Sequence, residues 1–133
     1  MTDLATLSAS ALAKAIRDKR LSSVEATKAA IERLRACHEL TNCLITLEAD
    51  EALSAAKAAD AAIAGARATG PLAGVPLAHK DMFDRKGKVA SWGAKIRPDK
   101  PAAADATAIA RFQAAGKRSE PPVSDPRPTG MAP

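Results

Sequence analysis

Lys80 is the residue whose position in this sequence best suits chemistry. It follows an apolar run over residues 72–78 and directly precedes Asp81. A lysine withdrawn from water at the end of such a run loses its preference for the charged form, and a neutral lysine can act as a general base. Alternatively, its stem lies along apolar surface while the ammonium group stays in water and pairs with Asp81. The residue types alone favour this second interpretation.

A second group, Cys37, His38 and Cys43, contains residue types that bind metal ions. Structural zinc sites use four ligands, typically in pairs about two to four residues apart. Two thiols and one histidine do not complete such a set, so we expect a helix end with buried thiols. No glycine-rich phosphate-binding pattern is present either. We therefore expect no metal ion at the cysteine and histidine group and no phosphate-binding loop.

The elements that must position these residues contain few large apolar side chains with which to form a core. The 133 residues include 33 alanines but only 27 Leu, Ile, Val, Met, Phe or Trp, and 2% are aromatic. Alanine buries little area, which predicts one domain at most with a thin core. The shortage of β-branched and aromatic residues excludes an all-β barrel or sandwich. With no membrane-length apolar stretch and no secretory signal, we expect a cytoplasmic chain with reduced thiols.

The net charge of +5 is concentrated in one segment. Residues 1–79 carry nine basic and nine acidic side chains, whereas residues 80–100 carry seven basic and three acidic ones. That basic segment contains only two aromatic residues and matches no nucleic-acid-binding motif. We therefore do not expect a nucleic-acid partner, and keep binding through residues 80–100 as a minor alternative.

Helix signals dominate the first part of the chain. Ser8 is a candidate N-cap, and the run from Ser22 to Glu25 is a capping box that opens a second helix. The alanine-rich residues 49–67 predict a third helix, because alanine is the best helix former. Asp105 is a candidate cap for a last helix that ends at Gly116.

Two short strands and a tail complete the predicted organisation. Residues 42–47 and residues 75–80 have the apolar character of strands, with Pro76 near the start of the second. Residues 117–133 contain five of the nine prolines and almost no bulky apolar side chains. This composition predicts a disordered C-terminal tail.

The segment from Gly70 to Phe83, GPLAGVPLAHKDMF, resembles the region around the catalytic lysine of the amidase signature family. The order of the other features, from the helix after Asp3 to the helix that ends at Gly116, is also similar to the N-terminal part of that family. The resemblance covers about residues 3–116. We therefore interpret residues 1–116 as the N-terminal part of an amidase-like domain, followed by a separate tail over residues 117–133.

This resemblance implies an α/β fold in which helices flank part of a mixed sheet. It implies cleavage of carboxamide C–N bonds, either by a broad amidase or by a tRNA-dependent amidotransferase subunit, with a small-molecule amide as substrate. The implied triad is a nucleophilic serine, a second serine with a cis peptide bond, and a lysine that matches Lys80. The resemblance implies no cofactor. His79 and Asp81, which flank the lysine, are expected to be structural.

The sequence departs from the family pattern in its serines. The family places both catalytic serines in a glycine- and serine-rich stretch, and none of the serines here lies in such a cluster. We therefore expect a truncated or frameshifted product with little activity of its own, because a triad acts as a unit. An exposed sheet edge could lead such a fragment to self-associate. The alternative is a small helical interaction module without catalysis.

Overall fold

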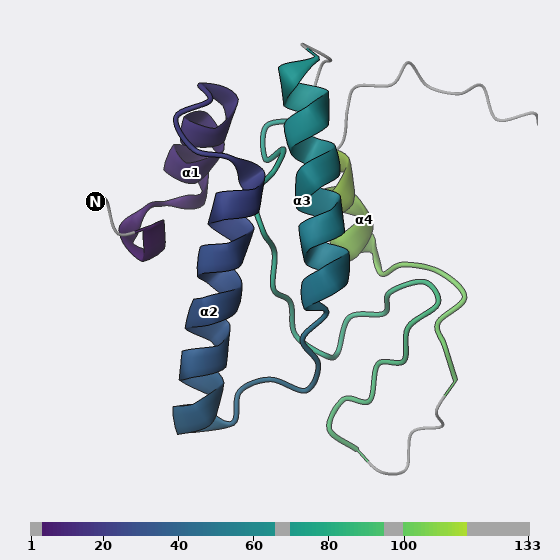
Figure 1. Cartoon of the computed structure of the whole chain (residues 1–133). Coiled ribbons are helices and arrows are strands. Elements are labelled where there is room, and N and C mark those ends of the chain that lie inside the picture. The colour runs from purple at the N-terminus through teal and green to yellow at the C-terminus, as the bar shows by residue number, and fades with distance from the viewer. Residues whose placement is uncertain (1–3, 66–69, 95–99, 117–133) are drawn as a thin grey trace, which may run out of the picture.

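The computed structural model describes residues 4–65, 70–94 and 100–116, and these residues form a helical unit (Figure 1). A short 3₁₀-helix η1 (Leu4–Thr6) precedes α1 (Ala9–Arg17), α2 (Ser23–Thr41) and α3 (Ala49–Ala64), and α4 (Thr107–Gly116) follows a long connection. The predicted tail over residues 117–133 lies outside the described residues.

The first two helices begin where their capping residues predict. The Ser8 hydroxyl accepts a 3.2 Å hydrogen bond from the backbone N–H of Ala11. At the start of α2, the Ser22 hydroxyl accepts from the N–H of Glu25 at 3.0 Å, and the Glu25 carboxylate accepts from the N–H of Ser22 at 2.8 Å. Both predicted helix starts are therefore confirmed, and α3 begins at the expected residue.

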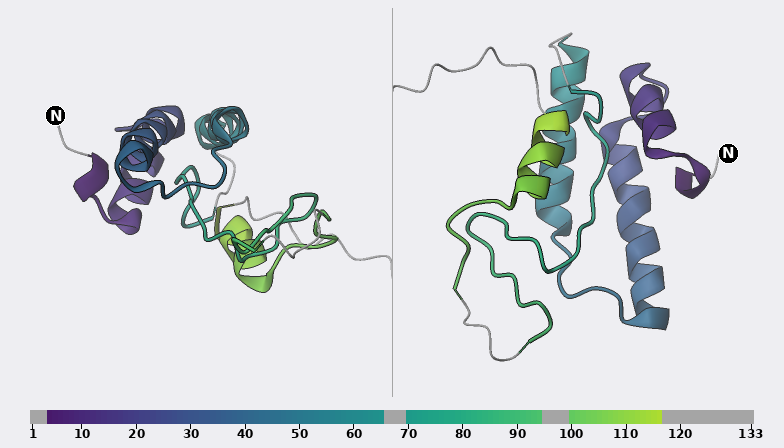
Figure 2. Two further views of the ribbon diagram at one scale, coloured as in Figure 1. Left: turned by 90° about the horizontal axis from the view of Figure 1, so that it is seen from below. Right: turned by 180° about the vertical axis from the view of Figure 1, so that it is seen from behind.

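Helices α2 and α3 lie side by side and form the main packed pair, with α1 beside the start of α2 (Figures 1 and 2). Among the described residues nine apolar side chains are buried, and six of them are alanines. The three larger ones are Ile16, Ile31 and Ile109. Small side chains allow the helices to approach closely but remove little apolar area from water. The thin core predicted from composition is therefore confirmed.

The two predicted strands are not strands, and the described residues contain no sheet. Residues 42–48 and 75–80 are irregular, and the β-type pairing recorded is one isolated parallel bridge between Lys86 and Ala102. A strand is defined by hydrogen bonds to a neighbouring strand, which an apolar segment cannot provide for itself. The described part of the chain is therefore helical. The expected α/β fold with a mixed sheet and an exposed sheet edge is not found among these residues.

The described parts of the connection between α3 and α4, residues 70–94 and 100–106, run past α3 and lead to the start of α4 (Figure 2). Ile109 of α4 is buried, whereas Phe112 of the same helix remains 47% exposed. Asp105 does not cap α4 as expected, because the helix begins at Thr107 and Asp105 lies two residues before it. Its carboxylate instead accepts a 2.7 Å hydrogen bond from the N–H of Lys86. The start of α4 is instead tied to the connection by the N–H of Ala106, which donates to the carbonyl of Asp84.

No helix within the described ranges is both long and apolar enough to cross a membrane.

Candidate functional site

The segment that leads to Lys80 begins at a tight turn around Gly74. This glycine has φ +78°, in the left-handed region, and a Cβ there would lie 3.0 Å from Cγ2 of Ile16 and 3.1 Å from Cβ of Ser23. Both the backbone conformation and the space therefore require glycine. The turn consequently packs directly against α1 and α2, although Gly74 lies 51 residues beyond Ser23 in sequence.

Three hydrogen bonds fix this turn to three different helices. The Ser23 hydroxyl of α2 donates to the carbonyl of Gly74 at 2.7 Å. The Arg17 guanidinium of α1 donates to the carbonyl of Pro71 at 3.1 Å. The N–H of Leu72 donates to the carbonyl of Ala115 in α4 at 3.0 Å. The turn that precedes the lysine is therefore held in place by α1, α2 and α4 together.

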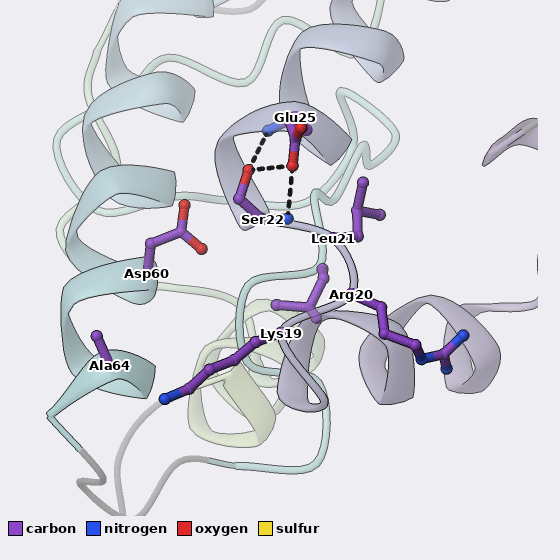
Figure 3. Close-up of a pocket in the computed structure, with 8 residues that line it drawn as sticks. Lys19, Arg20, Leu21, Ser22, Glu25, Asp60 and Ala64 are labelled. Atoms are coloured by element: carbon purple, nitrogen blue, oxygen red, sulfur yellow. Dashed lines mark hydrogen bonds between the residues drawn. The ribbon is translucent and has the colours of Figure 1, made fainter. Parts of the chain in front are cut away.

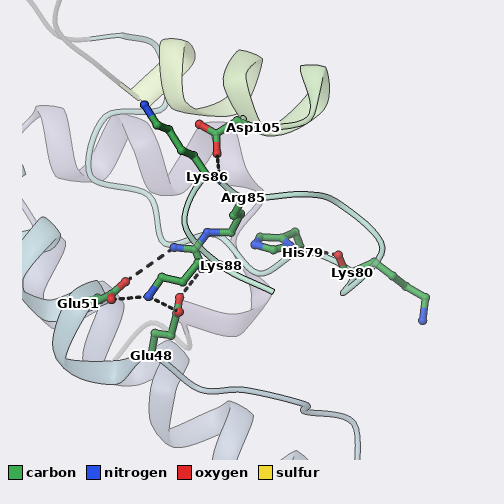
Figure 4. Close-up of polar contacts among 8 residues, drawn as sticks. All are labelled: Glu48, Glu51, His79, Lys80, Arg85, Lys86, Lys88 and Asp105. Atoms are coloured by element: carbon green, nitrogen blue, oxygen red, sulfur yellow. Dashed lines mark hydrogen bonds and ion pairs between the residues drawn. The ribbon is translucent and has the colours of Figure 1, made fainter. Parts of the chain in front are cut away.

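Lys80 lies at the far end of the irregular segment that leaves this turn. Its side chain is exposed and points away from the other labelled residues (Figure 4). Within the described part of the chain, no ion pair or hydrogen bond is recorded for its ammonium group. Its carbonyl accepts a 3.2 Å hydrogen bond from the N–H of Phe83 and lies 3.1 Å from Nδ1 of His79. The backbone at Lys80 is therefore held locally, while the ammonium group extends into solvent.

Asp81 does not pair with Lys80 as the sequence suggests. Its carboxylate accepts hydrogen bonds from the hydroxyl of Ser91 at 2.6 Å and from the N–H of Ser91 at 3.0 Å. The Ser91 hydroxyl, followed by backbone N–H groups of the same turn, holds the pKa of Asp81 below its ordinary value. This carboxylate therefore anchors the segment that follows the lysine.

The turn held by Asp81 has an unusual backbone. Trp92 and Gly93 have φ values of +56° and +68°, and Trp92 is 57% exposed. A non-glycine residue in the left-handed region is uncommon and persists where the surroundings hold it in place. Sequence reasoning missed Ser91 as the partner of Asp81. The only available signal was a serine directly before a Trp-Gly pair, which is typical of many turns.

A cluster of four charged side chains fixes the same connection to α3 (Figure 4). Arg85 pairs with Glu48, and the ammonium of Lys88 lies 2.8 Å from Glu48 and 2.5 Å from Glu51. The Lys88 ammonium and then the Arg85 guanidinium hold the pKa of Glu48 below its ordinary value. The same pairing, with Glu48 first, raises the pKa of Lys88. Two cations of the basic segment are thus neutralised within the molecule, which sequence reasoning did not anticipate.

A pocket of about 310 Å³ lies at the start of α2, and Lys80 does not line it (Figure 3). Lys19, Arg20 and Asp60 contribute to its lining. The Asp60 carboxylate accepts hydrogen bonds from the N–H groups of Ser23 and Val24, so it occupies the N-terminus of α2 where an anion would bind. The Ser22 hydroxyl is bonded to Glu25. The Ser22 hydroxyl and the N-terminus of α2 are therefore both already engaged within the molecule.

The cysteine and histidine group forms no ligand set. Cys37 and Cys43 are exposed, so the expectation of buried thiols is wrong, because the lower end of α2 extends past α3 (Figure 1). Nδ1 of His38 accepts a 3.1 Å hydrogen bond from the N–H of Leu44. This bond links α2 to the segment that follows it. No cluster of three or more potential metal ligands occurs among the residues the structure describes.

Comparison with known proteins connects this geometry to one family. The family model named Amidase matches residues 25–118, which include the turn at Gly74, Lys80 and Asp81. The chain is 42% identical over 112 residues to the A subunit of the glutamyl-tRNA(Gln) amidotransferase of Thiobacillus denitrificans. It is 41% identical over 117 residues to the protein of the same name from Mycobacterium avium.

The coverage of these matches is unequal. The aligned region is 84% and 87% of this chain, but 23% and 24% of the two relatives. The chain therefore spans about a quarter of the length of the curated relatives it matches.

Comparison with solved structures also finds matches to part of longer chains. The fold matches a vestigial protein complex, determined in work on the origins of an s-triazine catabolic enzyme, with a TM-score of 0.73 and 33% identity. The match covers 79% of this chain and 23% of that chain. An inhibitor-bound form of the same complex matches with a TM-score of 0.72 and 34% identity. Because the family match covers most of the sequence and includes the lysine segment, this chain belongs to the amidase family.

Proposed function

We propose that this chain provides the lysine of an amidase-type site, with Lys80 as the residue that transfers protons during cleavage of a carboxamide C–N bond. The observation that carries this proposal is the placement of Lys80. Its segment is fixed before the lysine at Gly74 and after it at Asp81, while its ammonium group has no recorded partner among the described residues. A proton-transfer group needs a held backbone, and its amine becomes neutral only when the elements that complete the site withdraw it from water.

The proposed chemistry divides the work between Lys80 and two serines. A serine hydroxyl attacks the amide carbon, and its proton passes through a second serine to the neutral lysine amine. The lysine then returns that proton to the departing nitrogen, which leaves as ammonia or an amine. Water hydrolyses the resulting ester and releases the acid. No external oxidant or reductant is required.

The two serines are the part of this site that residues 1–133 do not provide in recognisable form. None of the serines lies in a glycine- and serine-rich cluster, and Ser91, the nearest to Lys80 in sequence, donates its hydroxyl to Asp81. Removing the nucleophile from a triad removes most of the rate enhancement. We therefore expect the chain alone to hydrolyse no amide at a measurable rate.

Glutamine is the first substrate to test. The two relatives described above are named as subunits of glutamyl-tRNA(Gln) amidotransferases, and the side-chain amide of glutamine is a primary carboxamide. A simple aryl or alkyl carboxamide is the second substrate, which separates a broad amidase from a glutamine-specific one.

The decisive experiment is a chimera. In the Thiobacillus denitrificans relative, the aligned stretch is replaced by the corresponding residues of this chain, and ammonia release from glutamine is measured. We expect an active chimera in which Lys80→Ala and Lys80→Arg each reduce the rate by about 100-fold or more, because arginine keeps the charge but cannot accept a proton. Lys86→Ala is the matched control, since Lys86 is exposed in the same connection. An inactive chimera, or equal rates for the Lys80 and Lys86 variants, would refute the proposal.

A second candidate is a small interaction module without catalysis. It is supported by the number of large apolar side chains that remain exposed among the described residues, including Leu77, Met82 and Trp92. The two candidates differ in the chimera, because a pure interaction module would not depend on the amine of Lys80.

A further inference from the structure

A turn further along the chain holds the carboxylate of Asp81, the residue directly after Lys80. The hydroxyl of Ser91 donates to one carboxylate oxygen at 2.6 Å, and the N–H of Ser91 donates to the same oxygen at 3.0 Å. The Ser91 hydroxyl also accepts a 3.2 Å hydrogen bond from the N–H of Gly93, which directs its own proton towards Asp81. The link between Ser91 and Asp81 is therefore made by two donors and is itself held by the turn.

The backbone of this turn is shaped to bind an anion. Successive N–H groups in such a turn point to one side and form a concave nest that attracts negative charge. Trp92 and Gly93 have φ values of +56° and +68°, and after Ser91 their N–H groups contribute to the lowered pKa of Asp81. Trp92 is 57% exposed, so packing of its ring does not account for its left-handed backbone. This conformation instead brings the N–H groups towards the carboxylate of Asp81.

The same anchor fixes the backbone from which the side chain of Lys80 begins. The Lys80 carbonyl accepts a 3.2 Å hydrogen bond from the N–H of Phe83, which closes a turn with Asp81 as its second residue. The peptide unit between Lys80 and Asp81 is planar, and it is held on one side by this turn and on the other by the Asp81 carboxylate. Its orientation determines where the Cα–Cβ bond of Lys80 points. The start of the lysine side chain is therefore set by contacts of the residues that follow it.

We propose that Ser91 and Asp81 are positioning residues for Lys80. The Ser91 hydroxyl orients the carboxylate of Asp81, which fixes the adjoining peptide unit and so places the Lys80 amine for proton transfer. Neither residue contacts the substrate or transfers a proton. A displacement of about 1 Å at a reacting group can reduce the rate by about 100-fold, so the loss of this anchor has a measurable effect. This inference rests on the proposed function, because the position of the amine affects the rate only if Lys80 takes part in the reaction.

The first test uses the chimera in which this chain replaces the aligned stretch of the Thiobacillus denitrificans relative. We expect Ser91→Ala to reduce kcat for glutamine hydrolysis by about tenfold to 100-fold, with KM changed by less than about twofold. The reason is that a misplaced lysine impairs the chemical step but not the binding of glutamine. Ser91→Thr keeps the hydroxyl and should recover kcat to within about threefold of the unsubstituted chimera.

Control variants separate positioning from a purely structural role. Rates are expressed per folded molecule, as measured by circular dichroism, and Ser54→Ala at an exposed position of α3 is the matched control. Equal kcat values for Ser91→Ala and Ser54→Ala, alongside an inactive Lys80→Ala variant, would overturn the inference and leave the proposed function standing. A Lys80→Ala variant as active as the unsubstituted chimera would overturn both. A change confined to KM, or a loss that Ser91→Thr fails to recover, would also overturn the inference.

The second test uses the full chain without any fusion. In backbone NMR spectra, Ser91→Ala should shift the amide signals of Lys80 and Phe83, because the turn between them loses its anchor at Asp81. Ser91→Thr and Ser54→Ala should leave these two signals close to their original positions. This measurement does not depend on catalysis, so it distinguishes failure of the anchor from failure of the proposed function. Unchanged signals at Lys80 in the Ser91→Ala variant would overturn the inference, even if the activity of the chimera fell.

Discussion

The hydroxyl of Ser23 donates a 2.7 Å hydrogen bond to the carbonyl of Gly74, 51 residues further along the chain. Ser23 is 1% exposed at the start of α2, and Gly74 forms the turn from which the lysine segment leaves. The bond therefore connects the helical core to the segment that carries Lys80. Changes at either residue should affect the stability of the helical unit and the position of the lysine together.

Gly74→Ala should lower the free energy of unfolding by about 2–4 kcal/mol, measured by urea denaturation. About 1–2 kcal/mol of this comes from an alanine in the left-handed region, and the rest from the close approach of its Cβ to Ile16 and Ser23. Gly87→Ala is the matched control, because Gly87 also has φ +78° but a Cβ at this position would meet no atom within 4 Å. Equal losses in the two variants would show that packing at Gly74 contributes nothing.

Ser23→Ala should destabilise the chain by about 1–3 kcal/mol, because it leaves the Gly74 carbonyl without its partner in a part-buried position. Ser54→Ala, on an exposed position of α3, should change stability by less than about 0.5 kcal/mol. Urea midpoints of the two variants at neutral pH provide the comparison. A Ser23 variant as stable as the Ser54 variant would contradict the importance of this bond.

Acid should release the turn after Lys80. Because Ser91 lowers the pKa of Asp81, this pairing contributes stability above the unfolded pKa of about 3.9, and the contribution is lost as pH falls through the lower folded pKa. Trp92 is the only tryptophan and lies in that turn, so its fluorescence reports the transition. Ser91→Ala should move the fluorescence midpoint to higher pH, towards the ordinary value of a carboxylate. A midpoint unchanged by the substitution would contradict the assignment.

The cluster at Glu48 should make stability depend on pH in two directions. Its carboxylate has a lowered pKa, so its contribution is present above an unfolded pKa of about 4.3 and is lost at lower pH. Lys88 has a raised pKa, so its contribution is present below about 10.4 and is lost at higher pH. Glu48→Gln should therefore reduce the loss of stability on acidification, measured as urea midpoints at low ionic strength. Glu32→Gln, at an exposed position of α2, should retain the wild-type dependence.

Local signals in the sequence predicted the helices well. The capping box joins Ser22 to Glu25, three residues away, and α3 follows from a run of alanines. Such interactions need no distant partner, so the sequence contains all of their participants side by side. Asp105 shows the limit of this reasoning, because a distant N–H, that of Lys86, takes the carboxylate that was expected to cap α4.

The amino-acid sequence by itself determined the helix starts, the thin alanine core and, through the segment around Lys80, the family. The catalytic role of Lys80 stays a prediction. Only the tertiary structure decided the partners of Gly74, Asp81 and Glu48, because these contacts span 51, 10 and 37 residues. It also decided that residues 75–80 form no strand among the described residues. The physical reason is the same in each case: helix hydrogen bonds are satisfied within one segment, whereas a strand or an ion pair depends on which distant groups the fold brings within reach.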